Sequence, residues 1–191
     1  MTVDLVARLR SGTLDLILAP GRTPGYNFIT RSLGTVEFAW MASPTLGIYG
    51  KRLGPRDLQK WPVIALAKES YHHATIEDWF RAGSAYCRRI DTCKSLGVAA
   101  SLTAAGLGVS YLPIRCYQDE IAKGLLQTQE TVPQIPTVEF TATTSVDTFH
   151  PVGELMANLA VEISDFYKSD GKRKPRTKPG ELARMDTISP R

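Results

Sequence analysis

Residues 104–113 of this chain read Ala-Ala-Gly-Leu-Gly-Val-Ser-Tyr-Leu-Pro. Small residues, a glycine, a short run with β-branched and aromatic residues and a closing proline are typical of a helix that stops and passes into a buried strand. Residues 9–18, Leu-Arg-Ser-Gly-Thr-Leu-Asp-Leu-Ile-Leu, follow the same order. Two such junctions in separate halves of the chain predict an α/β protein with two sheet-containing lobes.

The remaining segments alternate between helical and strand patterns, which favours parallel sheets with helices on their faces. Helix 95–105 is expected to bury Val98, Ala99, Leu102 and Ala105. The last helix is expected to bury an apolar stripe made of Val152, Leu155, Met156, Leu159, Ile163 and Phe166. The expected helices span residues 2–11, 54–58, 74–82, 95–105, 117–123 and 151–167. The expected strands span 14–19, two parts of 28–41 separated at 32–34, 62–67, 89–93, 109–112, 125–126 and 138–144.

Composition limits the class of protein. The chain has 191 residues, of which 43% are hydrophobic, and this suffices for one globular domain or two small lobes. No apolar run reaches the roughly 18 residues of a membrane-spanning helix, and the N-terminus lacks the pattern of a secretory signal. Cys87, Cys93 and Cys116 are odd in number and lack Cys-x-x-Cys spacing, which favours a reduced, cytoplasmic setting.

The net charge of +4 is concentrated at the C-terminus. Residues 1–167 hold 15 Lys and Arg against 16 Asp and Glu, whereas residues 168–191 hold 8 against 3. The tail 168–191 is also poor in large apolar residues, so we expect it to be basic and disordered. A basic tail can contact nucleic acid, but a solvated tail is the more common case.

Four segments in this order resemble the effector-binding domain of LysR-type transcriptional regulators. Two of them are the junctions quoted above. The third is 38–44, Phe-Ala-Trp-Met-Ala-Ser-Pro, at the position of a strand that crosses between lobes. The fourth is 57–64, Asp-Leu-x-x-Trp-Pro-Val-Ile. The order and spacing of the four segments carry the resemblance, which covers residues 2 to about 167.

This resemblance implies a two-lobe, periplasmic-binding-protein-like fold (type 2) with a small-molecule effector between the lobes. The family has a winged helix-turn-helix, and then a strand, a helix and a second strand, before the element that matches 2–11. We therefore expect an incomplete first lobe with an exposed sheet edge, and no DNA-reading domain in this polypeptide. The implied lobe one comprises 1–42 and 142–167, lobe two comprises 43–141, and the crossings lie near Ala42-Ser43 and Thr141-Ala142.

Loops beyond the carboxyl ends of strands collect ligands in open α/β folds, which gives three candidate loops. The resemblance places two of them, at Pro20–Arg22 and at Ser95, at the effector cleft, and the strand-end rule places the third there. Pro20, Gly21 and Arg22 follow the first strand, where Arg22 would bind a carboxylate through two hydrogen bonds. Ser95 begins helix 95–105, whose free N–H groups suit an anion, and Lys94 adds positive charge beside it. The alternatives are an exposed loop arginine, a plain N-cap serine and a solvated lysine.

The third loop follows strand 62–67 and carries Ser70, Tyr71 and His72. Ser70 offers a hydroxyl and Tyr71 a flat apolar face, and His72 would contact the ligand. His72 and His73 are adjacent, so they point apart and make a poor metal pair. Thr143, just beyond the second crossing, completes the expected effector-binding set.

No catalytic residue, metal or cofactor is expected. The chain lacks a Gly-x-Ser-x-Gly elbow, and Gly106-x-Gly108 lies at a helix end instead of a helix start, unlike a dinucleotide fingerprint. Trp40, Trp61 and Trp79 are interpreted as packing residues. The predicted function is that of an effector-sensing module of a LysR-type regulator. It would bind a small organic anion, form a homo-dimer or tetramer, and reach DNA only through a domain outside this chain. A stand-alone solute-binding protein is the alternative.

Overall fold

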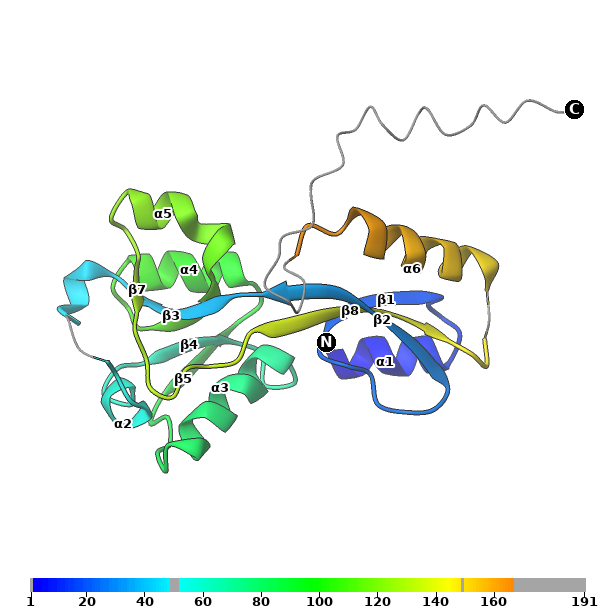
Figure 1. Ribbon diagram of the computed structural model, residues 1–191. Helices are drawn as coiled ribbons and strands as arrows, with labels where there is room; N and C mark the ends of the chain where they lie inside the picture. The colour runs from blue at the N-terminus through cyan, green and yellow to red at the C-terminus, as the bar shows by residue number, and fades with distance from the viewer. Residues whose placement is uncertain (1, 49–51, 149, 167–191) are drawn as a thin grey trace, which may run out of the picture. The chain divides into compact units, whose positions relative to one another are not determined.

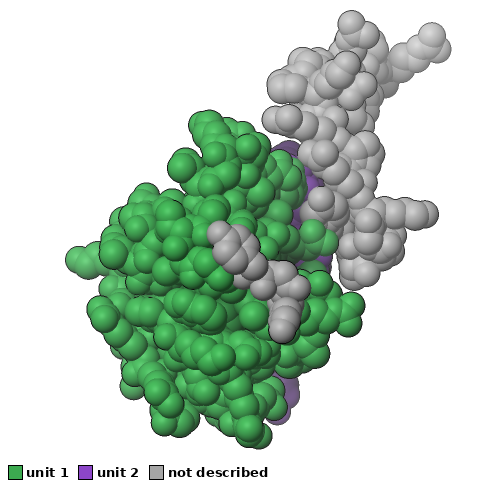
Figure 2. Space-filling view, turned by 90° about the vertical axis from the view of Figure 1, so that its left-hand side faces the viewer, with its two compact units in different colours: residues 1–8, 36–138 green, residues 9–35, 139–191 purple. Residues whose placement is uncertain are grey.

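The computed structural model describes residues 2–48, 52–148 and 150–166, and the predicted tail 168–191 lies outside these ranges. The chain divides into two compact units, coloured separately in Figure 2. Unit 1 comprises Met1–Arg8 and Val36–Val138, and unit 2 comprises Leu9–Thr35 and Glu139–Arg191. Because the two units are defined by compactness alone, they do not test the predicted lobe boundaries, which stay a prediction.

Unit 1 is built on β3 (Phe38–Ala42), which runs antiparallel to β6 (Ser110–Pro113) on one side and to β7 (Gln127–Gln129) on the other. A parallel pair, β4 (Val63–Leu66) and β5 (Ile90–Cys93), continues this sheet through a bridge between Val63 and Val109. The prediction of parallel strands is therefore confirmed for β4 and β5 and wrong for β3, which runs antiparallel to both of its neighbours.

Helices cover both faces of the unit 1 sheet (Figure 1). On one face lie α4 (Leu96–Ala104) and α5 (Gln118–Ala122), and on the other lie α2 (Pro55–Leu58) and α3 (Tyr71–Ala82). Successive strand residues alternate between the faces, so Trp40 and Met41 enter different apolar clusters. Trp40 packs with Trp79, Phe80 and other residues of the α3 face, while Met41 packs on the α4 face.

Unit 2 holds a second sheet in the order β1 (Leu16–Pro20), β8 (Val138–Ser145), β2 (Phe28–Val36), with β1 antiparallel to β8. Helix α6 (Pro151–Ile163) packs closely on β1, since a Cβ atom on Gly153 would lie 3.0 Å from the Asp15 carbonyl oxygen. Helix α1 (Thr2–Arg10) ends before Gly12, whose φ of 71° is the left-handed stop that the sequence predicts.

Two helices bury faces that differ from the prediction. In α4 the buried residues are Ala99, Ala100 and Thr103, while Val98 is 48% exposed and Ala105 is exposed as well. The expected burial of Val98 and Ala105 is wrong, because nearly every position of this helix is small or apolar and Thr103 has a hydroxyl partner inside. In α6 only Gly153 and Ala157 are buried. Four members of the predicted stripe are exposed instead: Val152, Leu155, Met156 and Ile163.

Several element boundaries also differ. The chain leaves β2 for β3 at Glu37, and the predicted break at 32–34 lies inside β2. Helix α3 begins at Tyr71, three residues earlier than expected, because Ser70 caps it. Strand β7 forms after Leu125 and Leu126, not at them. The short 3-10 turns are η1 (Pro44–Leu46) and η2 (Ile114–Tyr117). Over the described ranges, no helix is long and apolar enough to cross a membrane.

Candidate functional site: two capped helix N-termini and an arginine loop

Two helices of unit 1 begin at the same edge of its sheet. Strands β4 and β5 are parallel neighbours with Leu66 opposite Cys93, so the segments that leave their carboxyl ends emerge side by side. The first segment leads to Ser70, whose Oγ accepts a hydrogen bond of 3.1 Å from the His73 N–H. The second leads to Ser95, whose Oγ accepts one of 3.2 Å from the Val98 N–H. Both serines that the sequence singles out in this unit thus lie beyond the carboxyl ends of neighbouring parallel strands.

This edge has the chemistry of an anion site. The first turns of α3 and α4 carry backbone N–H groups and a partial positive charge. Lys94 is exposed next to Ser95 and adds a full positive charge. Tyr71, in the first turn of α3, is 38% exposed and offers an aromatic face. Each serine keeps a hydroxyl hydrogen that it can donate, since it uses an oxygen lone pair for its cap.

His72 occupies a different environment from the predicted ligand-facing loop. It lies inside helix α3 and is buried, with Nε2 2.6 Å from the Tyr111 carbonyl oxygen. Its Nδ1 accepts a hydrogen bond of 3.4 Å from the Leu66 N–H. Burial lowers the pKa of His72, and the bond to Tyr111 opposes this only in part. Both ring nitrogens therefore serve to join α3 to the sheet.

The second group of predicted residues lies in unit 2. Gly21 follows β1 with a φ of 79°, and its N–H donates to the Glu139 carbonyl oxygen at 2.8 Å. Arg22 is exposed and its Nε donates to Glu139 Oε2 at 3.2 Å. A hydrogen bond from Ser32, and then the Arg22 pair, hold the pKa of Glu139 below its usual range. Since a guanidinium carries five N–H donors, this pair uses a fraction of those on Arg22.

Two further predicted residues are structural in their contacts. Pro20 is the last residue of β1, and its register partner is Phe140. Thr143 is fully buried on β8, where its Oγ1 lies 3.3 Å from the Thr30 hydroxyl and 3.5 Å from that of Thr23. The hydroxyl of Thr143 is therefore part of a threonine cluster within unit 2.

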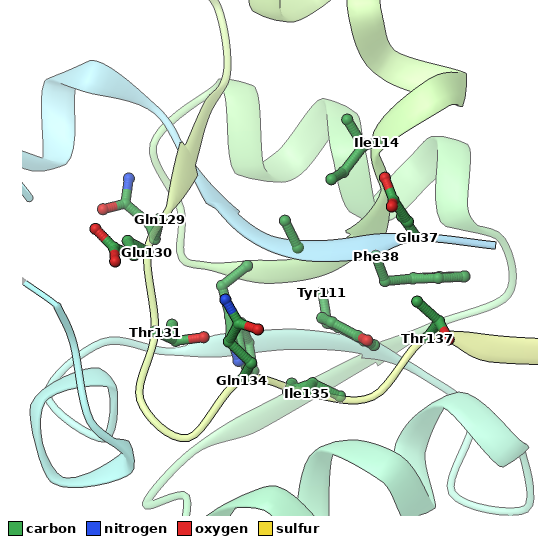
Figure 3. A pocket seen from close by; sticks show the side chains of 12 residues that line it. Glu37, Phe38, Tyr111, Ile114, Gln129, Glu130, Thr131, Gln134, Ile135 and Thr137 are labelled. Atoms are coloured by element: carbon green, nitrogen blue, oxygen red, sulfur yellow. The ribbon is translucent and has the colours of Figure 1, made fainter. Parts of the chain in front are cut away.

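Sequence reasoning missed a cavity in unit 1. It measures about 260 Å³ and lies between β3 and the segment 130–137, which leaves the sheet after β7 (Figure 3). Trp40, interpreted from the sequence as a packing residue, lines it together with Phe38 and Tyr111. The cavity shares no residue with the predicted effector-binding set. No spacing in the sequence signals it, because it arises where the 130–137 segment leaves the sheet. Within the described ranges, no group of His, Cys, Asp and Glu residues could hold a metal ion.

Comparison with known protein families matches the LysR substrate binding domain over residues 1–152. The chain belongs to this family. The helix–glycine–strand junctions and the α/β units described above agree with that assignment, and they confirm the predicted fold class.

Solved structures with the same fold are regulatory domains or larger regulators of the LysR type. The CcmR regulatory domain from Synechocystis PCC6803, in complex with 2-PG, has a TM-score of 0.72 at 13% identity, covering 84% of this chain and 78% of that one. The sulfate-bound OxyR2 regulatory domain from Vibrio vulnificus has a TM-score of 0.66 at 17% identity, covering 84% and 76%. A mutant OxyR from Corynebacterium glutamicum has a TM-score of 0.68 at 19% identity, covering 84% and 51%.

The chain thus spans about half the length of the Corynebacterium regulator. A search of curated proteins gave no match.

Proposed function

We propose that this chain is the effector-sensing module of a cytoplasmic LysR-type transcriptional regulator and that its effector is a small organic anion. The observation that carries the proposal is the pairing of two capped helix N-termini, at Ser70 and Ser95, on one sheet edge. Backbone N–H groups at such positions bind carboxylate and phosphate oxygens. The sequence predicts Arg22 as a further effector contact, because a guanidinium binds a carboxylate with two parallel hydrogen bonds.

Two relatives in fold support an anionic ligand. The OxyR2 regulatory domain is sulfate-bound, and the CcmR regulatory domain is in complex with 2-PG. Family membership favours a regulatory domain over a stand-alone solute-binding protein. We further propose that the module has no catalytic role, that it acts as a homo-dimer or tetramer, and that DNA is contacted by a separate domain. An effector then changes transcription only through a difference in its affinity for two arrangements of the assembly.

Thermal unfolding with a panel of small carboxylates, aromatic acids and phosphorylated acids tests the proposal. A ligand present at about 100 times its Kd raises the free energy of unfolding by about 2.7 kcal/mol, which is a clear shift in Tm. For the best ligand, Arg22→Ala and Ser95→Ala are each expected to raise Kd by about tenfold, as expected for a lost charge-assisted hydrogen bond.

Matched controls are available in unit 1. Arg81 is exposed and paired with Asp78 much as Arg22 is paired with Glu139, and Ser101 is an exposed serine of α4. Arg81→Ala and Ser101→Ala should leave Kd within about twofold of the parent value. If Arg22→Ala and Ser95→Ala behave like these controls, the site assignment is wrong. If no anion in the panel raises Tm, the anionic effector is wrong.

A further inference from the structure

The pairing between β3 and β7 ends before β3 itself does. The two strands pair as far as Trp40 and Gln129, and the same register would place Thr131 opposite Phe38. Strand β7 stops at Gln129, however, and within the described ranges no backbone hydrogen bond joins Phe38 to Thr131. The ladder therefore opens at Phe38.

The backbone groups of Phe38 point toward this opening. The Ile114 N–H donates to the Glu37 carbonyl oxygen at 3.0 Å, so Glu37 bonds on the β6 side. Hydrogen-bonded and non-hydrogen-bonded pairs alternate along an antiparallel ladder, so Phe38 and its register partner Pro113 form a non-hydrogen-bonded pair. The N–H and C=O of Phe38 are therefore directed to the other edge of β3, where β7 has ended.

Thr131 directs its backbone groups into the same opening. On the far side of this segment, the Leu53 N–H donates to the Glu130 carbonyl oxygen at 2.9 Å, and the Val132 N–H donates to the Leu53 carbonyl oxygen at 3.0 Å. Thr131 lies between these two residues, so its own N–H and C=O are on the edge that faces β3. Among the described residues, the backbone groups of Phe38 and Thr131 thus face a gap without a hydrogen-bond partner.

The cavity between β3 and the 130–137 segment occupies this gap. It measures about 260 Å³, and its lining includes the consecutive residues 37–40 of β3 together with Thr131. Side chains of a strand alternate between the two faces of a sheet, so a cavity lined by consecutive residues lies along the strand edge. In Figure 3, Glu37 and Ile114 lie on one side of the β3 ribbon and Ile135 lies on the other, as expected for an opening at an edge.

The unpaired backbone groups select the hydrogen bonding of a ligand. Native proteins satisfy nearly all backbone N–H and C=O groups that are away from bulk water with protein, water or ligand. A cis amide presents one N–H and one C=O side by side. It can therefore pair with both backbone groups of Phe38, as an added strand would.

Size and charge restrict the ligand further. The volume lies just below the roughly 300–1,000 Å³ of typical small-molecule pockets, so the cavity suits a single small ring. The described lining includes the carboxylates Glu37 and Glu130 and no Lys, Arg or His, which disfavours an anion. The half-buried side chains of Ile114 and Ile135 offer apolar surface to the ring.

We propose that this cavity is a second binding site, for a small uncharged molecule with a cis amide, such as a lactam. The carbonyl of the ligand accepts a hydrogen bond from the Phe38 N–H, and its N–H donates to the Phe38 carbonyl oxygen. The ring fills the gap toward Thr131, and the exposed Gln134 lies at the opening. The site shares no residue with the anion site proposed above, so each proposal can fail without the other.

The first measurement uses the chain without ligand. Hydrogen–deuterium exchange followed by NMR compares the backbone N–H of Phe38 with that of Trp40, which lies in the paired part of the ladder. The Phe38 N–H is expected to exchange at least about tenfold faster, because it has no acceptor. A Phe38 N–H that is protected as well as that of Trp40 would show that the edge is closed and would overturn the proposal.

The probes for binding are 2-piperidone and N-methyl-2-piperidone, which share a ring and a carbonyl and differ in the N–H donor. Titration of the ¹⁵N-labelled chain follows the backbone N–H resonance of Phe38, with that of Phe80 inside α3 as the reference. Because ligands this small bind weakly, concentrations reach about 20 mM. 2-Piperidone is expected to shift the Phe38 resonance in a saturable way and to slow its exchange. The N-methyl probe is expected to bind at least about fivefold more weakly, since it lacks the donor.

A pair of surface variants tests the location. Gln134→Phe places a ring at the opening and is expected to raise the Kd of 2-piperidone at least about tenfold. Gln118→Phe is the matched control, since Gln118 is also exposed in unit 1 and lies outside the lining. Its Kd should stay within about twofold of the parent value.

Three binding results would also overturn the proposal. A Phe38 resonance that stays fixed at the highest 2-piperidone concentration means that the cavity holds water only. Equal affinity for the N-methyl probe means that the hydrogen-bond argument is wrong. Unchanged binding in Gln134→Phe means that the ligand sits elsewhere.

Discussion

The Nε2 atom of His72 lies 2.6 Å from the carbonyl oxygen of Tyr111. Because a carbonyl can only accept, Nε2 carries the proton, and Nδ1 is left to accept from the Leu66 N–H. The neutral imidazole thus links α3 to β6 and β4 at once. Protonation of Nδ1 would set two donors against each other, so the folded unit holds this histidine in its neutral form.

The first prediction concerns pH. Burial lowers the pKa of His72 in the folded state, whereas the unfolded chain keeps a value near 6.5. Below about pH 6.5 the unfolded state binds more protons at this residue, so the free energy of unfolding falls as pH falls toward the lowered folded-state pKa. The slope from one proton is at most about 1.4 kcal/mol per pH unit. Urea unfolding between about pH 7.5 and 5.5 measures it.

His72→Gln keeps a donor for the Tyr111 carbonyl oxygen and removes the titration. It should remove this part of the slope, whereas His150→Gln, at an exposed position, should keep it. An unchanged slope in His72→Gln would assign the pH dependence to other groups.

The second prediction concerns a buried pair of hydroxyls. Thr103 Oγ1 lies 2.7 Å from Ser110 Oγ, and Ser110 in turn donates to the Ile64 carbonyl oxygen at 2.9 Å. Ser110→Ala leaves that carbonyl without its donor and should lower the free energy of unfolding by about 1–3 kcal/mol. Ser101 lies on the exposed side of α4, the helix that carries Thr103. Ser101→Ala should keep the free energy of unfolding within about 0.5 kcal/mol of the parent value. Urea midpoints of the two variants that coincide would contradict this account.

The third prediction sets two glycines against each other. A Cβ atom on Gly108 would lie 2.4 Å from the Pro62 carbonyl oxygen, so Gly108→Ala should destabilise the chain by about 3 kcal/mol. A Cβ atom on Gly97, inside α4, would meet only the Ser95 hydroxyl at 3.9 Å. Gly97→Ala should therefore stabilise by about 0.5–1 kcal/mol through helix propensity. Thermal unfolding should move Tm in opposite directions, and shifts of the same sign would show that backbone clearance does not govern these positions.

The fold could be predicted where glycine and apolar runs mark an element's end. The stop at Gly12 and the caps at Ser70 and Ser95 are local chemistry, and the structure contains all three. Helix faces could not be predicted in the same way. Thr103 is buried because Ser110 offers it a partner from another strand, and a pattern within one helix carries no information about that partner.

The same distinction between local and distant determinants applies to the candidate sites. The neighbouring helix N-termini at Ser70 and Ser95 follow from strand order, because the carboxyl ends of the parallel strands β4 and β5 share an edge. The cavity at Trp40 could not be predicted, since its walls come from β3, β6 and the 130–137 segment, which are distant from one another in the sequence. The contacts of His72 and Thr143 likewise involve residues distant in the sequence.

Helix α6 packs on the sheet through Gly153 and Ala157, whereas its larger apolar side chains are exposed to water. The Glu154 side chain bonds Thr144 of β8 and Arg31 of β2, whereas Val152, Met156 and Ile163 are exposed. Among the described strands, β1 lies at the edge of this sheet. An edge strand and exposed apolar side chains in the same unit both favour self-association of the chain. High protein concentration should therefore favour aggregation, and a charged residue in place of the exposed Leu18 should reduce it.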